Sequence, residues 1–330
     1  MEELLGNEAV RARIWRAADE GRMHHCYLFE GPEGVGKAMT AMRLALTVNC
    51  LSDHAPCGTC ASCRTILAGT HPDVVVVGPD PEKLTRIITA DQARAVITGL
   101  QLQRHSARRR FVIIDPVDAL SEEGANALLK TLEEPPAGTQ FILVTSRAAS
   151  LLPTVRSRSQ RVRFGPVARE ALEGWLSARG LDPALAVLSA GSPGFALRLA
   201  DGEAQERRDV VEQLLGVVGQ PLHLLFSFSE AAGKRSEGSV ERTTLAVDAL
   251  EELLRDAVFV ASGRERDVLH PTHLGALRVW AAALHPGGIG RLDKAIAAAR
   301  DRLKLNVNGR VVLEALFTAL NLELSQARRA

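Results

Sequence analysis

The sequence predicts an α/β domain built on a parallel sheet, followed by a segment that is helical to the end of the chain. Short apolar runs occur at Cys26–Phe29, Val74–Val77, Phe111–Ile114 and Phe141–Val144. Helical patterns lie between these runs, and buried strands that alternate with helices are typical of a parallel sheet covered on both faces. After Gly165 the strand signals fade, and apolar residues recur at the spacing of three and four that favours helices.

The elements of the first part follow in a regular order. We expect helices over residues 7–21, 38–48, 88–102 and 125–132, and a fifth strand over residues 161–164. Pro135-Pro136 ends the last of these helices, because proline has no amide hydrogen and collides with the preceding turn. These elements account for one domain over residues 1–165.

The second part divides at a change of pattern. Residues 166–200 carry short helical patterns over 168–178 and 183–199, and Gly191-Ser192-Pro193-Gly194 interrupts the second. From residue 201 onward we expect helices over 207–218, 241–260, 272–284 and 310–324. The sequence therefore predicts a small helical domain over 166–200 and an all-α domain over 201–330.

Composition excludes several classes of protein. The chain has 330 residues, of which 46% are hydrophobic, and a net charge of +1 from 40 basic and 39 acidic residues. This balance disfavours binding of nucleic acid through bulk charge. No apolar run approaches the ~18 residues of a membrane span, and Met1-Glu2-Glu3-Leu4-Leu5 lacks the pattern of a signal peptide. We therefore expect a cytoplasmic protein with no membrane partner.

A phosphate-binding loop follows the first predicted strand. The loop is Gly31-Pro32-Glu33-Gly34-Val35-Gly36-Lys37, and it opens a helix, which is the context of a Walker A motif. Gly31, Gly34 and Gly36 let backbone amides surround a phosphate, and Lys37 reaches the outer phosphates. The sequence therefore predicts a nucleotide site for ATP or ADP.

Two positions of this site lack catalytic side chains. Ala38 stands where a Ser or Thr hydroxyl binds magnesium, and Thr40 is too far along the helix to replace it. Asp115 ends the third strand as the candidate carboxylate on the magnesium side, but Pro116 follows it and cannot orient water. We therefore expect a pocket that holds ATP or ADP at most, and a chain that is not an active ATPase by itself.

Four cysteines form a compact cluster. Cys50, Cys57, Cys60 and Cys63 have the spacing C-x6-C-x2-C-x2-C. Gaps of two residues let neighbouring thiolates converge on one tetrahedral ion, and four thiolates leave no open position for catalysis. The sequence therefore predicts a structural zinc module at about residues 50–63, while Cys26 belongs to a strand and to the core.

Several motifs occur in an order that resembles a known family. They are His25-Cys26-Tyr27-Leu28-Phe29-Glu30-Gly31-Pro32, Gly69-Thr70-His71-Pro72-Asp73, Asn126-Ala127-Leu128-Leu129-Lys130-Thr131-Leu132-Glu133-Glu134-Pro135-Pro136 and Thr154-Val155-Arg156-Ser157-Arg158-Ser159. The chain resembles the bacterial clamp loader family, the AAA+ subunits of the DNA polymerase III holoenzyme. The resemblance implies an AAA+ domain, a helical lid and a helical collar domain that forms the oligomer.

Departures from the family pattern separate its subunit types. The motor subunit of the family has a Thr, a Glu and a lid arginine at the positions of Ala38, Pro116 and Gly194. Loss of all three resembles the delta-prime type, whose own ATP site is degenerate. The resemblance then implies a subunit of a complex with motor gamma/tau and delta subunits, which loads the sliding clamp onto primed DNA.

Arg158 is the candidate catalytic residue that the resemblance identifies. In the family a Ser-Arg-Cys motif supplies an arginine finger to the ATP of the next subunit, and Ser157-Arg158-Ser159 matches it with serine in place of cysteine. A guanidinium suits the charge that develops on a transferring phosphoryl group. From charge spacing alone, Arg156, Arg158, Arg161 and Arg163 fit solvated residues that flank a strand.

Two other functions remain as alternatives. One is an active gamma/tau-like ATPase motor of the same complex, which turnover of ATP by the isolated chain would reveal. The other is a zinc-dependent nucleic-acid-binding protein, against which the near-zero net charge weighs.

Overall fold

The computed structural model describes residues 4–80, 87–217, 222–233, 239–304 and 307–326. The chain divides into two compact units, Met1–Ala200 and Asp201–Ala330. Among the described helices, none has the length and apolar character needed to cross a bilayer.

The first unit is built on a parallel sheet, as the sequence predicts. Its described strands are β1 (Cys26–Glu30), β2 (Val74–Val77), β3 (Arg110–Ile114), β4 (Thr139–Thr145) and β5 (Gln160–Arg163). The strand order is β2-β3-β4-β1-β5, so β4 lies between β1 and β3. Every residue of β1 is buried, whereas the edge strand β5 buries only Val162.

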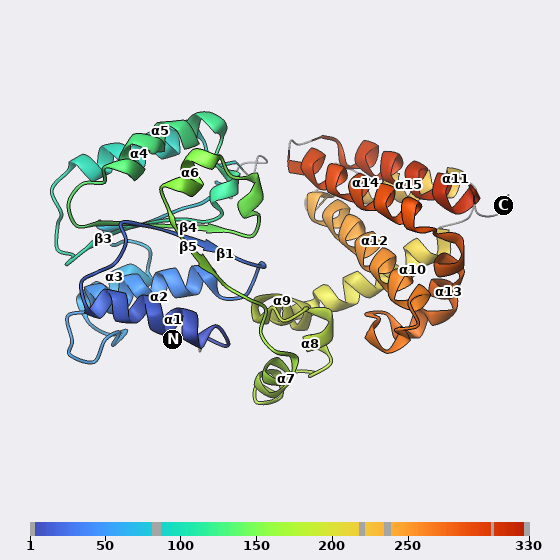
Figure 1. The fold of residues 1–330 in the computed structure, drawn as a ribbon, viewed down its shortest axis with the longest axis horizontal. Coiled ribbons are helices and arrows are strands. Elements are labelled where there is room, and N and C mark those ends of the chain that lie inside the picture. The colour runs from blue at the N-terminus through green and yellow to red at the C-terminus, as the bar shows by residue number, and fades with distance from the viewer. Residues whose placement is uncertain (1–3, 81–86, 218–221, 234–238, 305–306, 327–330) are drawn as a thin grey trace. The chain divides into compact units, whose positions relative to one another are not determined.

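Helices cover both faces of this sheet (Figure 1). One face carries α1 (Glu8–Asp19), α2 (Lys37–Asn49) and α3 (Ala61–Leu67), and the other carries α4 (Ala90–Gln101), α5 (Glu122–Glu133) and α6 (Pro153–Ser157). Successive side chains of a strand point to opposite faces of the sheet. In β1, Tyr27 and Phe29 pack toward the first face, and Cys26 and Leu28 pack toward the second. Capping explains two helix starts, since Thr89 accepts from the Gln92 amide and Ser121 from the Gly124 amide.

Three short helices complete the first unit. They are α7 (Arg169–Ser177), α8 (Leu185–Leu188) and α9 (Pro193–Arg198). Ser192 caps α9 by accepting from the Phe195 amide, and Pro193 occupies the first turn, where its missing amide hydrogen costs nothing. The glycine-containing break in the sequence pattern is therefore the start of a helix.

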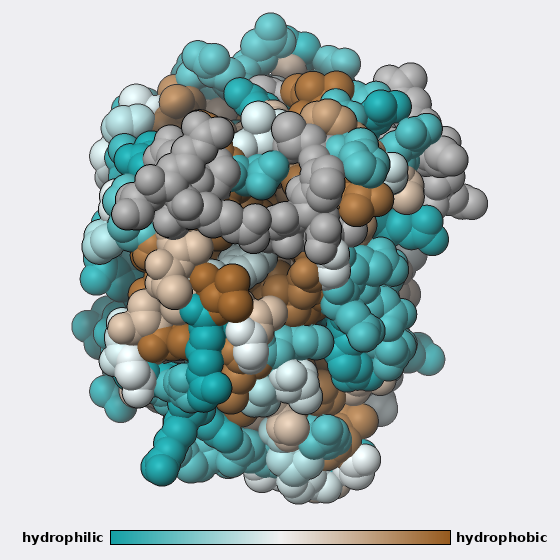
Figure 2. Space-filling view, turned by 90° about the vertical axis from the view of Figure 1, so that its right-hand side faces the viewer, coloured by the Kyte–Doolittle hydropathy of each residue, from teal (hydrophilic) through white to brown (hydrophobic). Residues whose placement is uncertain are grey.

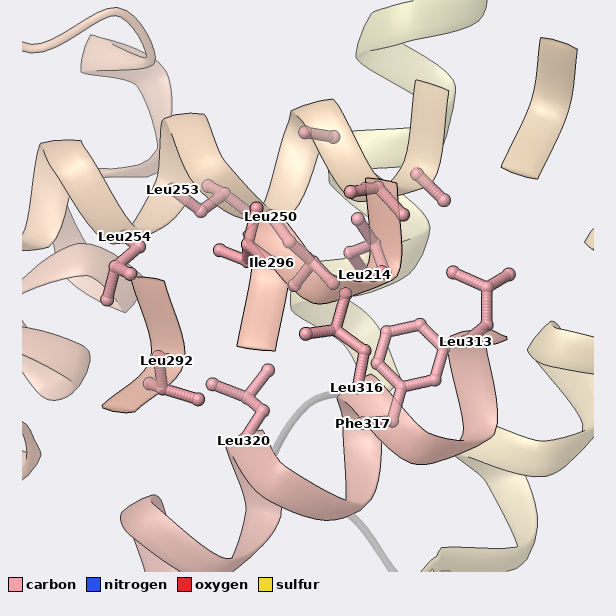
Figure 3. Close-up of a cluster of buried hydrophobic side chains, with 14 of the residues drawn as sticks. Leu214, Leu250, Leu253, Leu254, Leu292, Ile296, Leu313, Leu316, Phe317 and Leu320 are labelled. Atoms are coloured by element: carbon pink, nitrogen blue, oxygen red, sulfur yellow. The ribbon is translucent and has the colours of Figure 1, made fainter. Parts of the chain in front are cut away.

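The second unit consists of helices. They are α10 (Ala204–Val217), α11 (Leu222–Gly233), α12 (Ser239–Ala261), α13 (Leu274–Ala283), α14 (Pro286–Lys304) and α15 (Gly309–Gln326). Leucines and Phe317 from these helices form its core, with Leu250 and Leu253 of α12 among them (Figure 3). The sequence patterns did not predict α11 and α14 as separate helices.

Short helical turns join the longer elements. They are η1 (Val117–Ala119), η2 (Ala148–Ser150), the π-helical η3 (Leu199–Glu203), η4 (Glu265–Asp267) and η5 (Pro271–His273).

One face of the molecule shows hydrophobic patches among hydrophilic side chains (Figure 2). Exposed large apolar residues of the second unit include Val279, Val311 and Leu322.

Candidate functional site

The phosphate-binding loop has the geometry that its glycines require. It joins β1 to α2, and Gly31, Gly34 and Gly36 have φ values of 149°, 73° and 91°. Such positive φ values favour glycine. At Gly31 a Cβ atom would lie 2.1 Å from the carbonyl oxygen of Phe164, so the loop passes too close to the chain after β5 for any side chain.

Lys37 is turned onto the loop itself. Its Nζ donates to the carbonyl oxygen of Gly31 at 2.7 Å and also to that of Pro32. Burial lowers the pKa of Lys37, and the charge of Asp115 opposes that shift. Asp115 follows β3 and lies at the same edge of the sheet, where burial raises its pKa against the pull of Lys37. The five predicted nucleotide residues are therefore brought together at the carboxyl edge of the sheet.

The position at which the sequence would require a magnesium-binding hydroxyl lacks one. Ala38 follows Lys37 in α2, and the hydroxyl of Thr40 donates to the carbonyl oxygen of Gly36 at 2.7 Å. Thr40 is only 1% exposed, so its oxygen is directed into the helix. Neither residue offers a magnesium ligand in this arrangement.

Asp118, two positions after Pro116, is already engaged. Its carboxylate accepts from Thr145 Oγ1 at 2.7 Å and from Arg147 Nε at 3.0 Å. The side chain of Asp118 is only 4% exposed. This pairing fixes the chain after β4 and keeps the carboxylate from replacing the residue that Pro116 displaces.

The start of α9 packs directly on the phosphate-binding loop. The Gly194 amide donates to the carbonyl oxygen of Gly34 at 2.9 Å, and Ser192 Oγ donates to that of Glu33 at 2.8 Å. A Cβ atom on Gly194 would lie 3.1 Å from both Cα and O of Gly34. Glycine at position 194 therefore does more than omit an arginine, because it permits this close backbone contact.

Arg158 lies at the opposite edge of the sheet. It follows α6 and precedes β5, and Gln160 at the start of β5 pairs with Tyr27 near the start of β1. The strands are parallel, so this edge holds their amino ends while the phosphate-binding loop holds the carboxyl end. At about 3.3 Å per residue, β1 alone separates the edges by roughly 13 Å. Arg158 therefore lies at the edge of the sheet remote from the phosphate-binding loop of its own chain.

The serine that replaces the family's cysteine is accommodated. Ser159 Oγ donates to the carbonyl oxygen of Val155 at 2.8 Å and lies 3.3 Å from Cys26 Sγ. Arg161 and Arg163 both donate to the buried carboxylate of Glu30. Arg161 and Arg163 thus join β5 to the end of β1. Arg158 instead borders an open hollow of about 420 Å³ together with His24 and His25.

The four predicted zinc ligands lie together. The sulfur atoms of Cys50, Cys57, Cys60 and Cys63 are all within 4.8 Å of one another. Zn–S bonds of about 2.3 Å in a tetrahedron place sulfurs about 3.8 Å apart, so the cluster fits a metal with little adjustment. The residues present could hold such an ion between the end of α2 and α3.

Backbone amides orient these thiols. The Cys60 amide donates to Cys57 Sγ at 3.3 Å, and the Cys57 amide donates to Cys50 Sγ at 3.4 Å. The Cys60 amide, followed by Thr59, lowers the pKa of Cys57 to about 6, whereas burial raises the pKa of Cys63 to about 12. Amide donors of this kind stabilise thiolates, which are the form that binds metal.

Two acidic residues have specific partners that the spacing of the sequence does not reveal. Asp73 is 1% exposed and accepts from the amides of Ser106 and Ala107 at 2.9 and 3.0 Å, which holds the arginine-rich loop of residues 104–109 before β3. Glu133 pairs with Arg158 at the end of α5. Both belong to motifs that carry the family resemblance, but their partners lie 25 or more residues away and cannot be assigned from spacing.

The sequence is similar to those of known DNA polymerase III subunits. The family model described as DNA polymerase III, delta subunit, matches residues 6–168. DNA polymerase III subunit delta' of Bacillus subtilis is 29% identical over 317 residues, which cover 94% of this chain and 95% of that protein. The corresponding subunit of Pseudomonas aeruginosa is 37% identical over 63% of this chain and 66% of its own length.

The chain is also similar in sequence to tau subunits of DNA polymerase III. DNA polymerase III subunit tau of Salmonella typhimurium is 31% identical over 83% of this chain, which covers 45% of that longer protein. The parallel sheet with a phosphate-binding loop after β1 agrees with these relationships. The chain therefore belongs to the DNA polymerase III clamp loader family and is of the delta-prime type.

Proposed function

We propose that this chain is a stator subunit of the clamp loader, which does not hydrolyse ATP itself and completes the ATP site of a neighbouring motor subunit. The observation that carries the proposal is the placement of two unlike features at opposite edges of one sheet. The carboxyl edge holds a phosphate-binding loop beside Ala38 and Pro116, and the amino edge presents Arg158.

The arrangement of subunits in a ring supports the proposal that Arg158 acts on the nucleotide of a neighbouring subunit. In a head-to-tail assembly each subunit uses different surfaces toward its two neighbours. An arginine at the edge remote from its own pocket is suited to such an interface, because it cannot contact a nucleotide bound by its own chain. A guanidinium there would stabilise the charge that develops on the transferring phosphoryl group.

The rest of the assignment follows the delta-prime relatives. The proposed partners are motor gamma/tau and delta subunits, with the sliding clamp and primed DNA reached through the assembled complex. We assign residues 1–165 to the AAA+ domain, 166–200 to the lid and 201–330 to a collar that forms the oligomer. Zinc held by Cys50, Cys57, Cys60 and Cys63 would have a structural role, and the pocket would hold ATP or ADP without efficient turnover.

A second candidate is an active gamma/tau-like motor, which the similarity to a tau subunit favours. Turnover of ATP with magnesium by the isolated chain separates the two functions. If the chain is a stator, its turnover should not exceed that of a Lys37→Ala variant, because Ala38 and Pro116 supply neither a magnesium-binding hydroxyl nor a group that orients water. Brisk turnover that this variant loses would establish the motor function instead.

Clamp loading tests the arginine directly. Arg158→Ala should leave assembly of the complex intact and slow loading of the clamp onto primed DNA. An arginine finger accounts for roughly a thousandfold in rate in systems where it has been removed. Normal loading by this variant would contradict the proposed role.

A further inference from the structure

Glu133 holds one side of the Arg158 guanidinium. Arg158 Nε donates to Glu133 Oε1 at 2.6 Å, and Nη2 donates to the same oxygen. Glu133 is the last residue of α5, and Arg158 follows α6, so two helices that pack on one face of the sheet bring the pair together. The contact joins residues 25 positions apart and depends on the tertiary fold.

A second contact fixes the guanidinium from the other side. Arg158 Nη1 donates to the carbonyl oxygen of Thr154 at 2.9 Å. A guanidinium is planar and carries five N–H groups in fixed directions. Bonds from Nε, Nη1 and Nη2 to two separate acceptors therefore determine both the position and the plane of the group.

Arg158 also borders the open hollow. Besides its bond to Thr154, Nη1 has a longer contact with Ser157 Oγ at 3.4 Å. The hollow is bordered by His24, His25 and Gln160 in addition to the Arg158 region. The bonds to Glu133 and Thr154 use three of the five N–H groups of the guanidinium. One N–H on Nη2 and one on Nη1, the latter with only the long contact to Ser157, are left for phosphoryl oxygens.

We propose that Glu133 is a positioning residue that orients Arg158 toward a phosphoryl group of the neighbouring subunit's nucleotide. The inference rests on the proposed function of Arg158. An unrestrained arginine loses much rotamer freedom when it binds a phosphate, and a guanidinium that is already held loses less. Glu133 acts through Arg158 and does not contact the nucleotide.

The test uses the complex reconstituted with its motor subunits, in which ATP hydrolysis is measured in the presence of clamp and primed DNA. Glu133→Ala should lower kcat by about three- to tenfold, from the rotamer freedom returned to Arg158, and leave KM for ATP within about twofold. Glu133→Gln keeps an acceptor oxygen and should give an intermediate kcat. Glu134→Ala removes the adjacent exposed acid of the same motif and should leave kcat unchanged.

The variants also separate this inference from the proposed function. Arg158→Ala should lower kcat more than Glu133→Ala, and adding Glu133→Ala to Arg158→Ala should cause no further loss. An unchanged kcat in Arg158→Ala would overturn the proposed function. A lower kcat in Arg158→Ala with an unchanged or raised kcat in Glu133→Ala would overturn only the positioning role, since a raised value means that Glu133 competes with the phosphate. Assembly of each variant, measured by size-exclusion chromatography, must match that of the unaltered chain.

Discussion

Restoring the lid arginine should damage this chain without restoring ATP turnover. The perturbation is Gly194→Arg, which returns the side chain that the motor subunits carry. Here the Cβ atom of residue 194 would lie 3.1 Å from both Cα and O of Gly34, and the contacts are backbone atoms that cannot rotate away. The Gly194 amide also donates to the Gly34 carbonyl oxygen at 2.9 Å. The substitution therefore separates the start of α9 from the phosphate-binding loop.

The size of the effect follows from two contributions. Overpacking costs about 1–3 kcal/mol, and loss of the hydrogen bond adds about 1 kcal/mol. Packing of α9 on the phosphate-binding loop should therefore weaken by roughly 2–4 kcal/mol, which raises the population in which the two are separated by a factor of roughly 30 to 1,000. Because Ala38 and Pro116 remain, the open pocket still lacks a magnesium hydroxyl and a residue that orients water.

Hydrogen exchange measures this opening at the amides involved. The Gly194 amide should exchange faster by that factor in Gly194→Arg, with no gain in ATP turnover by the isolated chain. Gly174→Arg is the matched control, because Gly174 lies in α7 and a Cβ atom there meets nothing outside its own helix within 4 Å. If Gly194→Arg retained the protection of this amide and acquired turnover, neither the backbone clash nor the missing catalytic groups would limit this chain.

Two further predictions concern stability. Cys57→Ser should lose zinc and have a lower melting temperature, whereas the control Cys26→Ala should retain one zinc per chain. Metal analysis measures the zinc content, and thermal unfolding with and without chelator measures the stability. Full zinc content in Cys57→Ser would argue against the site. Asp73→Asn should destabilise the first unit by about 1–3 kcal/mol, because the amides of the loop before β3 lose a charged acceptor. Burial alone would raise the pKa of Asp73, but the bonds from Ser106, Ala107 and His105, with Arg110, outweigh it and hold the pKa below its usual range. Folding thus lowers this pKa, so the contribution of the Asp73 carboxylate to the free energy of unfolding is complete above about pH 4 and is lost as the pH falls through the folded-state pKa. Urea unfolding of Asp73→Asn and the unaltered chain at pH 7 and pH 3 checks this. Equal destabilisation at both pH values would contradict it.

The central strands β1, β3 and β4 could be predicted because they are buried on both faces. Their apolar runs are continuous, and the structure extends β3 and β4 by only one or two residues at their ends. The edge strand β2 was predicted from its four valines, although Val75 and Val76 are exposed. The short helices α3 and α6 were missed, since seven and five residues are too few for a helical period to emerge. In α14 three glycines near the start obscure the pattern, although the helix continues to Lys304.

The site was predictable only where chemistry follows the local order of residues. The glycines of the loop, Lys37 and the cysteines could be identified because each motif is short and its spacing is determined by the ligand. Contacts between distant segments could not be identified in this way. The pairing of Glu133 with Arg158 depends on how α5 and α6 pack, and the contact between Gly194 and Gly34 depends on how α9 meets the loop.

The most direct test of the central claim compares two variants of this chain in the assembled complex. Lys37→Ala removes the lysine of its own pocket, and Arg158→Ala removes the arginine at the opposite edge of the sheet. If the chain serves a neighbour's nucleotide and not its own, steady-state ATP hydrolysis by the complex should be unchanged by Lys37→Ala and strongly reduced by Arg158→Ala. The opposite pattern, a loss with Lys37→Ala and normal hydrolysis with Arg158→Ala, would contradict the account.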